Sequence, residues 1–190
     1  MIENLAGFLR EHMQAVLANR GAARRRAGAR GPQPIDVPEG ASMAPDLVDR
    51  VGAFNKAVDA LAESTNQHDR DWLALADLFA AGGTLAAIRG RAAALRAEHC
   101  EFLRRELDLL DRERTLLGRM ADSVTGPREM ANGLRARALD IVSHHRPAVE
   151  RELVEAFCAV LGVMPPRAMT SGRSVPAKRD EQRREALEVR

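Results

Sequence analysis

The chain has 190 residues, of which 45% are apolar and 29% charged, and it contains five Phe, one Trp and no Tyr. The net charge is +2, with a mildly acidic middle between two basic ends, and two cysteines are too few for a disulfide framework. No apolar run reaches the roughly 18 residues of a membrane-spanning helix, and abundant Ala, Leu, Arg and Glu predict one all-α domain of long helices rather than a sandwich or barrel.

The first predicted element is a short amphipathic helix over residues 1–20. Its apolar residues recur at steps of three and four, which places them on one face: Ile2, Leu5, Phe8, Leu9, Met13, Val16 and Leu17. Gly21 is expected to end this helix. Residues 21–43 are rich in Arg, Pro and Gly, and because proline fixes φ and lacks an amide hydrogen, we expect an extended or disordered linker outside the bundle.

A long second helix is predicted to begin near Ala44 or Pro45, because proline suits the first helical position. Its apolar seam has heptad spacing and comprises Leu47, Val51, Phe54, Val58, Leu61, Trp72, Leu75 and Phe79. The polar run 64–68 interrupts this seam, so the helix either continues with a polar layer or breaks and restarts at a cap. We expect it to continue, because the spacing keeps its phase across the run.

Gly82-Gly83 is expected to end the second helix, and Thr84 is expected to cap a third one that runs to about Val124. Two apolar stripes lie side by side on this helix: Leu103, Leu107, Leu110 and Leu117 form one, and Phe102, Leu109, Leu116 and Met120 form the other. The alternating charges of residues 104–114 are expected to form a solvated face. Because a slim bundle has a thin core, we expect one stripe to be left for a partner helix.

A turn at 125–127 leads into the last amphipathic segment, which ends near residue 163. Pro147 cannot donate to the carbonyl four residues earlier, so a kink or break is predicted at 144–147. Residues 164–190 lack an apolar stripe and are predicted to be a disordered basic tail. The predicted fold is an elongated antiparallel bundle or coiled coil of three long helices over residues 44–163, preceded by the short amphipathic helix.

The sequence contains no recognised catalytic or cofactor-binding motif, and no catalytic residue, metal or cofactor is predicted. The nearest approach to a metal-ligand set is His99, Cys100, His144, His145 and Cys158. Neighbouring helical residues point about 100° apart, so each adjacent pair offers only one ligand to a given site, and metal binding is disfavoured. Asp140 and His144 stand four apart on one helical face and predict a solvated pair rather than an acid–base dyad, since no nucleophile accompanies them.

Five arginines with no acid among them form the most pronounced local feature: Arg20, Arg24, Arg25, Arg26 and Arg30. They are candidates to bind an anion, either the phosphates of nucleic acid or the headgroups of an anionic membrane beside the amphipathic helix. A mitochondrial presequence is disfavoured by Glu3 and Glu11, since such peptides avoid acids. The alternative to all three is a solubilising linker.

The absence of catalytic motifs and the length of the helices favour a non-enzymatic adaptor or structural subunit that assembles with itself or with another helical protein through coiled-coil seams. Residues expected at a helix interface are Trp72, Phe102, Leu103, Leu107, Leu109, Leu110, Leu116 and Leu117. One alternative is a membrane-surface protein, because an amphipathic helix before long kinked helices resembles the N-BAR arrangement; another is a helical secretion or assembly chaperone. No small-molecule substrate is expected, and the cysteine usage favours an intracellular, cytoplasmic protein.

Overall fold

The computed structural model describes residues 2–26, 30–37, 43–124 and 128–165. All regular elements of this part of the chain are helical and none is a strand, which confirms the predicted all-α class. In chain order they are α1 (Ile2–Arg26), α2 (Pro45–Ala80), α3 (Leu85–Ser123), α4 (Arg128–Asp140), a π-helical turn η1 (Ile141–His145) and α5 (Arg146–Leu161).

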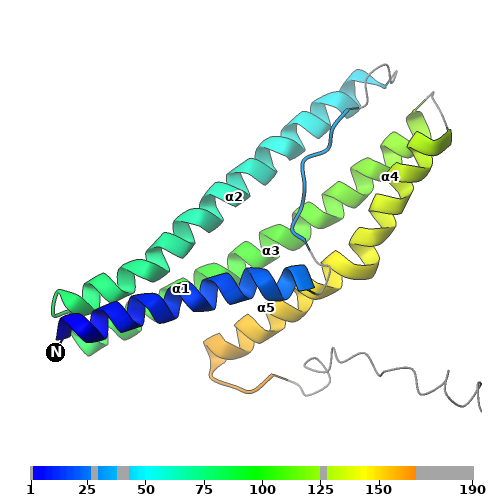
Figure 1. The fold of residues 1–190 in the computed structure, drawn as a ribbon. Helices are drawn as coiled ribbons and strands as arrows, with labels where there is room; N and C mark the ends of the chain where they lie inside the picture. Colours follow the sequence, from blue (N-terminus) through cyan, green and yellow to red (C-terminus); the bar gives the residue numbers. More distant parts are fainter. Residues whose placement is uncertain (1, 27–29, 38–42, 125–127, 166–190) are drawn as a thin grey trace, which may run out of the picture.

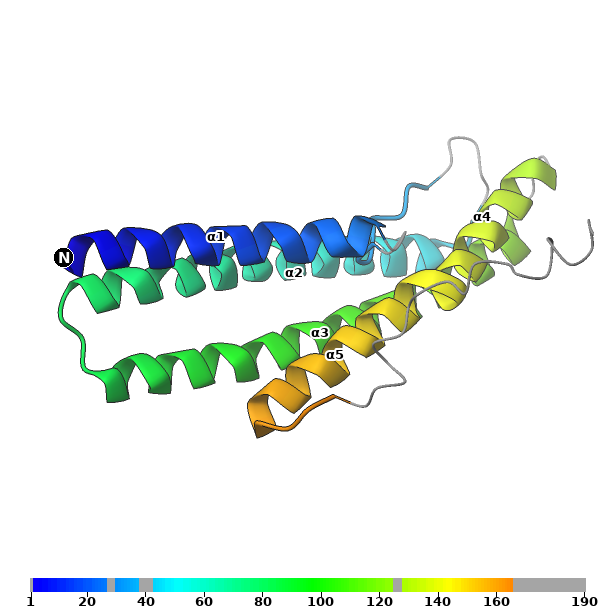
Figure 2. The same ribbon diagram turned by 60° about the horizontal axis from the view of Figure 1, so that its bottom comes forward.

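The helices form an elongated antiparallel bundle with α3 at its centre (Figure 1). α3 packs against α2, α4 and α5, whereas α1 packs along α2. Figure 2 shows α1 lying over α2 on one side of the molecule and α5 running beside α3 on the other. Of the three long helices predicted, α2 and α3 are continuous, and the third is divided into α4, η1 and α5.

α2 passes through the polar run 64–68 without a break, as its heptad phase predicts. The hydroxyl of Ser64 donates to the carbonyl oxygen of Ala60 at 2.8 Å, and that of Thr65 donates to the carbonyl oxygen of Leu61 at 2.9 Å. These side chains therefore bond to the helix that holds them instead of competing with it for a turn.

The helices begin and end near the residues that the sequence predicts. Pro45 occupies the first turn of α2, where its missing amide hydrogen costs no bond. Gly82 adopts a φ of +78° in the turn after α2, a conformation that favours glycine. The side chain of Thr84 then accepts a hydrogen bond from the amide of Ala87 at 3.2 Å, so the predicted N-cap of α3 is confirmed.

Pro147 marks the interruption of the last helical segment. Because it has no amide hydrogen, the α-helical ladder loses one bond at this point. The preceding residues form the π turn η1, in which the amide of Arg146 donates to the carbonyl oxygen of Ile141, five residues earlier. The axis changes direction between α4 and α5 (Figure 1). The predicted kink or break at 144–147 is confirmed.

α1 extends to Arg26, so the predicted end of this helix near Gly21 is wrong. A glycine inside a helix costs only about 1 kcal/mol relative to alanine. The residues that follow it are two alanines and three arginines, all strong helix formers. The backbone of the arginine run 24–26 therefore belongs to a helix and not to the linker.

Residues 30–37 form an extended segment, here called the strap, that follows α1 in the chain and passes across α3 toward α2 (Figure 1). The expectation of extended structure is confirmed for the strap, but the expectation that it lies outside the bundle is wrong. Pro32 and Ile35 are buried, and Ile35 is part of the hydrophobic core. The rest of the predicted linker at 27–29 and 38–42 lies outside the described residues, as does the predicted tail beyond residue 165.

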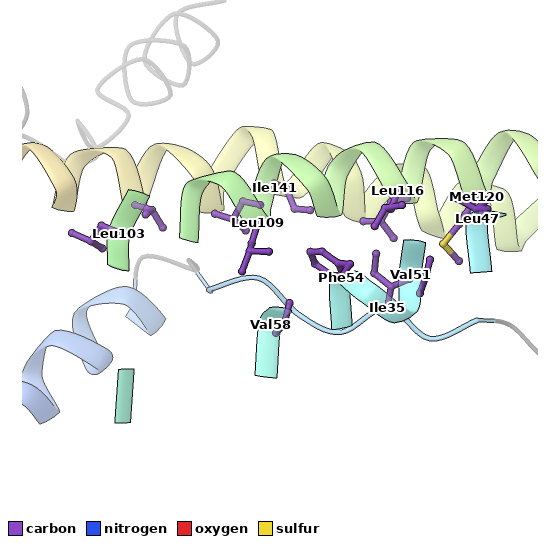
Figure 3. Close-up of a cluster of buried hydrophobic side chains, with 13 residues drawn as sticks. Ile35, Leu47, Val51, Phe54, Val58, Leu103, Leu109, Leu116, Met120 and Ile141 are labelled. Carbon is purple, nitrogen blue, oxygen red and sulfur yellow. The ribbon is translucent and has the colours of Figure 1, made fainter. Parts of the chain in front are cut away.

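A hydrophobic core joins the strap, α2, α3, η1 and α5 (Figure 3). Its buried members are Ile35, Leu47, Val51, Phe54, Val58, Leu103, Leu109, Leu110, Leu116, Leu117, Met120, Ile141 and Val149. Both stripes of α3 contribute to it, because α2, α4 and α5 all pack on this helix. The expectation that one stripe is left for a partner helix is therefore wrong, since Leu109 and Leu116 are only 5% and 8% exposed within one chain.

Candidate functional site

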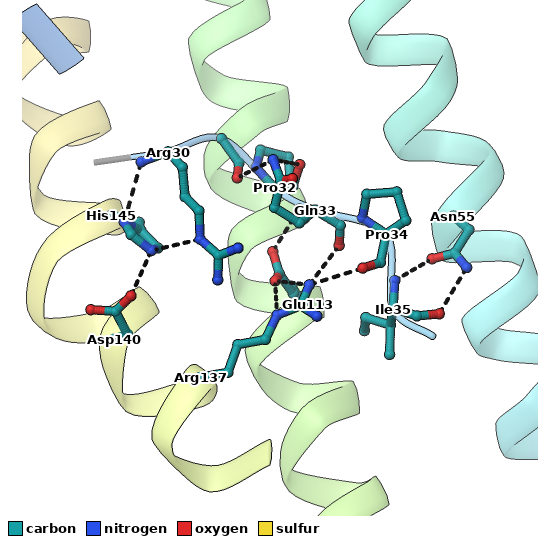
Figure 4. Close-up of polar contacts among 11 residues, drawn as sticks. Arg30, Pro32, Gln33, Pro34, Ile35, Asn55, Glu113, Arg137, Asp140 and His145 are labelled. Carbon is teal, nitrogen blue, oxygen red and sulfur yellow. Dashed lines mark hydrogen bonds and ion pairs between the residues drawn. The ribbon is translucent and has the colours of Figure 1, made fainter. Parts of the chain in front are cut away.

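The strap is held through its main chain by side chains of several helices (Figure 4). On α2, the Asn55 side-chain oxygen accepts from the amide of Ile35 at 2.9 Å, and its nitrogen donates to the carbonyl of Ile35 at 3.0 Å. Both main-chain groups of one residue are thereby satisfied, as buried backbone requires. This pairing fixes the register of the strap against α2.

A buried ion pair joins α3 to α4 beneath the strap. Glu113 is 1% exposed, and its Oε1 accepts from Nε and Nη2 of Arg137 at 2.9 and 2.6 Å. Its Oε2 accepts from the amide of Gln33 at 3.1 Å, while Arg137 Nη2 also donates to the carbonyls of Gln33 and Pro34, each at 3.0 Å. A buried charge is costly unless it is paired and hydrogen-bonded. The main chain of the strap supplies the remaining hydrogen-bond partners of Glu113 and Arg137.

His145 in η1 is 2% exposed and contacts the first residue of the strap. Its Nδ1 lies 3.2 Å from the amide nitrogen of Arg30, and its Nε2 lies 2.9 Å from Asp140 Oδ2 and 3.0 Å from Arg30 Nε. A neutral imidazole has one donor and one acceptor nitrogen, so it cannot accept from both the amide and Nε of Arg30. Because the carboxylate of Asp140 only accepts, we place the ring proton on Nε2, which donates to Asp140, and Nδ1 accepts from the Arg30 amide. Burial lowers the pKa of His145, the charge of Asp140 opposes this, and the charge of Arg30 lowers it further.

Asp140 also accepts a hydrogen bond from His144, so the predicted pair is present. His144 Nδ1 lies 2.8 Å from Asp140 Oδ1, and both side chains are open to solvent. This hydrogen bond lowers the pKa of Asp140. Within the described residues, no hydroxyl or thiol is hydrogen-bonded to a histidine.

A second histidine cluster lies where α2 meets α3. His68 is 3% exposed, and its Nε2 accepts from the indole nitrogen of Trp72 at 3.0 Å. The ring of His68 stacks on His99 with 5.8 Å between ring centroids. It packs edge to face with Phe102, with 4.9 Å between ring centroids. Because an indole only donates, His68 carries its proton on Nδ1, 3.6 Å from Glu98 Oε2. Burial lowers the pKa of His68, and the neighbouring His99 adds to this effect.

A cavity of about 200 Å³ adjoins this cluster and is lined by side chains of α1, α2, α3 and α5. Its walls carry the carboxylates of Asp69, Glu106 and Glu152 beside apolar groups such as Leu17. His99 Nε2 lies 3.4 Å from Glu152 Oε1. The lining is mainly apolar, and these carboxylates and histidines are its ionisable groups. In the part of the chain that is described, no three His, Cys, Asp or Glu side chains are grouped to hold a metal ion.

The cysteines and histidines considered as metal ligands are not brought together. Cys100 is buried, and burial raises the pKa of its thiol, which disfavours the reactive thiolate. Cys158 is partly buried on α5, while His145 lies against the strap. The expectation that the charged residues of 104–114 form a solvated face is wrong for Glu106 and Glu113, which are buried.

The structure places the other predicted site residues on several elements. Arg30 lies against His145, whereas the side chains of the predicted anion-binding residues Arg20, Arg24, Arg25 and Arg26 lie outside the described residues. Of the predicted interface residues, Leu103, Leu109, Leu110, Leu116 and Leu117 are buried in the chain's own core. Trp72, Phe102 and Leu107 are partly buried.

Large apolar side chains are exposed at the end of α5 and just beyond it. This cluster, here called the α5 surface, consists of Phe157, Val160, Leu161, Val163 and Met164. Phe157 is 44% exposed and Met164 is 89% exposed. The sequence predicts the amphipathic stripe of this segment but not its exposure, because periodicity does not indicate where neighbouring helices stop.

Comparisons with known proteins identify no family for this chain. No family model, curated protein or solved structure matches the chain. None of the described helices combines the length and the apolar character that crossing a bilayer requires.

Proposed function

We propose that the chain is a non-enzymatic helical adaptor that binds an amphipathic helix of a partner protein on the α5 surface. The observation that carries the proposal is the exposure of five large apolar side chains within eight residues, at 157–164. Contiguous apolar surface of a few hundred Å² marks interaction sites on monomeric proteins. On α5, the spacing of Phe157, Val160 and Leu161 matches one face of a helix, the arrangement that recognises a helical ligand.

The size of the α5 surface favours a single partner helix over a second copy of the chain. A stable interface buries about 800 Å² and about 20–30 residues on each partner. The α5 surface comprises five residues. Most of the leucines that were expected to drive self-assembly lie inside the chain's own core, which leaves less apolar surface for a second copy. A short amphipathic helix needs only a few anchoring side chains.

The chemistry of the described residues supports a binding role. The hydroxyls of Ser64, Thr65 and Thr115 donate to carbonyls four residues earlier in their own helices, and Cys100 is buried with a raised pKa. The exposed Asp140–His144 pair is hydrogen-bonded through Nδ1 of His144, and among the described residues no hydroxyl or thiol is hydrogen-bonded to it.

The proposal is tested by selecting helix-forming peptides from a displayed library on the purified chain. Enriched peptides should bind the wild type and lose about tenfold or more in affinity for the variant carrying Phe157→Asp and Leu161→Asp. Leu139→Asp, at an exposed position of α4, is the matched control and should keep the affinity.

Three outcomes would overturn this proposal. One is that selected peptides bind the double variant as well as the wild type. A second is dimerisation of the wild type that the same two substitutions abolish, which would assign the surface to a second copy. The third is flotation with phosphatidylserine-containing vesicles that Phe157→Asp and Leu161→Asp abolish, which would assign the surface to a membrane.

A further inference from the structure

We propose that the strap is an acid-released latch, in which neutral His145 holds the Arg30 end of the strap and protonated His145 releases it. This inference is independent of the α5 surface. It starts from the hydrogen bond between the Arg30 amide and His145 Nδ1, which is 3.2 Å long. The side chain of His145 is almost completely buried.

The bond requires the neutral ring. The Arg30 amide is a donor, so His145 Nδ1 has to present its lone pair, and the one ring proton then lies on Nε2 toward Asp140. When His145 gains a second proton, Nδ1 becomes a donor and faces another donor. The imidazolium also lies close to a fixed positive charge, because Arg30 Nε is 3.0 Å from Nε2.

The charged groups around His145 come from every element packed on η1. The strap supplies Arg30, and α4 supplies Asp140 and Arg137. α3 supplies Glu113, which is already paired with Arg137. The remaining charged groups are the neighbouring His144, bonded to Asp140, and Arg146 of α5, which bonds to Asp111 and Glu150. Asp140 favours the imidazolium, whereas Arg30 and burial oppose it.

The balance of these effects on the pKa of His145 determines the pH range in which the strap is released. Burial and Arg30 outweigh Asp140 and lower the pKa of His145 below its ordinary value of 6.5, so the latch is closed at neutral pH and opens in acid. The other strap contacts, at Asn55 and Glu113, do not involve histidine. Release therefore begins at Arg30 and Gly31, the end of the strap that lies against η1.

Hydrogen exchange of the strap tests the latch. In the wild type, the protection of the Arg30 amide, corrected for the intrinsic rate, should fall about tenfold or more between about pH 7.5 and pH 5. His145→Gln keeps an acceptor but cannot be protonated, so its protection should not change with pH. His144→Gln is the matched control, because it removes the exposed neighbour, and it should respond like the wild type.

Two further measurements keep the result interpretable. Protection of residues 103–117 in α3 should stay constant over the same range, which distinguishes release of the strap from global unfolding. If His145→Gln does not fold, Asp140→Asn provides the second test: it removes the carboxylate that favours the imidazolium, so the midpoint should move to lower pH. A wild type without pH dependence, a His145→Gln variant that responds like the wild type, or an unmoved midpoint in Asp140→Asn would overturn the latch.

Discussion

Glu113 illustrates how single residues specify the N-terminal part of this fold. Its carboxylate is 1% exposed and accepts from the Arg137 guanidinium and from the main chain of the strap. The same residue belongs to a run of alternating charges that predicts a solvated face. Sequence pattern alone does not identify it, because its partners lie 80 residues earlier and 24 residues later in the chain.

Replacing Glu113 by alanine should lower the free energy of unfolding by about 1–3 kcal/mol, because the Gln33 amide loses its acceptor and Arg137, whose side chain is 26% exposed, loses its carboxylate partner. Urea denaturation followed by circular dichroism measures the change. Glu101→Ala is the matched control: Glu101 pairs with Arg104 on the surface of the same helix, and exposed pairs contribute about 0–1 kcal/mol. Equal losses in the two variants would contradict the role assigned to Glu113.

His68 and Trp72 provide a second test, based on pH. Neutral His68 accepts from the indole, and burial followed by His99 lowers its pKa below 6.5. Its contribution to stability is therefore complete above about pH 6.5 and is lost as the pH falls through the lower pKa of the folded state, because the unfolded chain binds the proton first.

Trp72 is the one tryptophan in the sequence, so intrinsic fluorescence reports on this contact. In the wild type, protonation of His68 should quench the emission below pH 6.5, since the indole then faces a cation and loses its acceptor. His68→Gln should remove most of the acid change, and His12→Gln, on exposed α1, should retain it. Identical acid titrations of wild type and His68→Gln would exclude His68 as the group responsible.

At the scale of elements, α3 organises the bundle because it contacts α2, α4 and α5 at once. Its two stripes were identifiable from spacing alone, since helical periodicity is a local property of the sequence. The burial of both stripes was not identifiable in this way, because it depends on how α4 and α5 pack back along α3. The buried position of Leu109 and Leu116 inside one chain is the consequence.

Leu110→Ala should cost about 2–5 kcal/mol of stability, because Leu110 is fully buried and its removal leaves a cavity at the centre of the bundle. Leu116→Ala, on the other stripe, should also destabilise the isolated chain. Leu139→Ala changes an exposed leucine of α4 and should stay within about 0.5 kcal/mol of the wild type. Thermal denaturation of the three variants distinguishes one shared core from a core and a partner seam, since in the latter case Leu116→Ala would leave the isolated chain unchanged.

Local signals also account for the other elements that sequence predicts well. Pro147 and Thr84 act within one helical turn, so the interruption near 144–147 and the cap of α3 follow from the residue type. The strap is different: Ile35 is one apolar residue among prolines, and its burial depends on Asn55 and on packing with core residues of α2 and α3 that are distant in sequence. The exposure of the α5 surface likewise depends on where other helices end.

In the whole molecule, α1 and the strap belong to one N-terminal arm but are attached unequally. The described side chains of α1, at residues 7–19, include none that is buried, and an exposed pair between Arg10 and Asp77 supplements its packing on α2. The strap inserts Ile35 into the core and completes the contacts of Glu113 and Arg137. The stabilising contacts of the arm are therefore concentrated in its last few residues.

Two truncations separate these contributions. Deletion of residues 1–26 removes α1 and should leave a folded bundle with a modest loss of stability, because little of α1 is deeply buried. Deletion of residues 1–37 also removes the strap, and the further loss should be the larger one: burial of Ile35 alone is worth about 1.5–3 kcal/mol, and Glu113 loses the Gln33 amide as well. Urea denaturation of the full chain and both truncated forms measures the two steps. If most of the stability disappears with residues 1–26, α1 rather than the strap anchors the arm, because the strap is still present in that form.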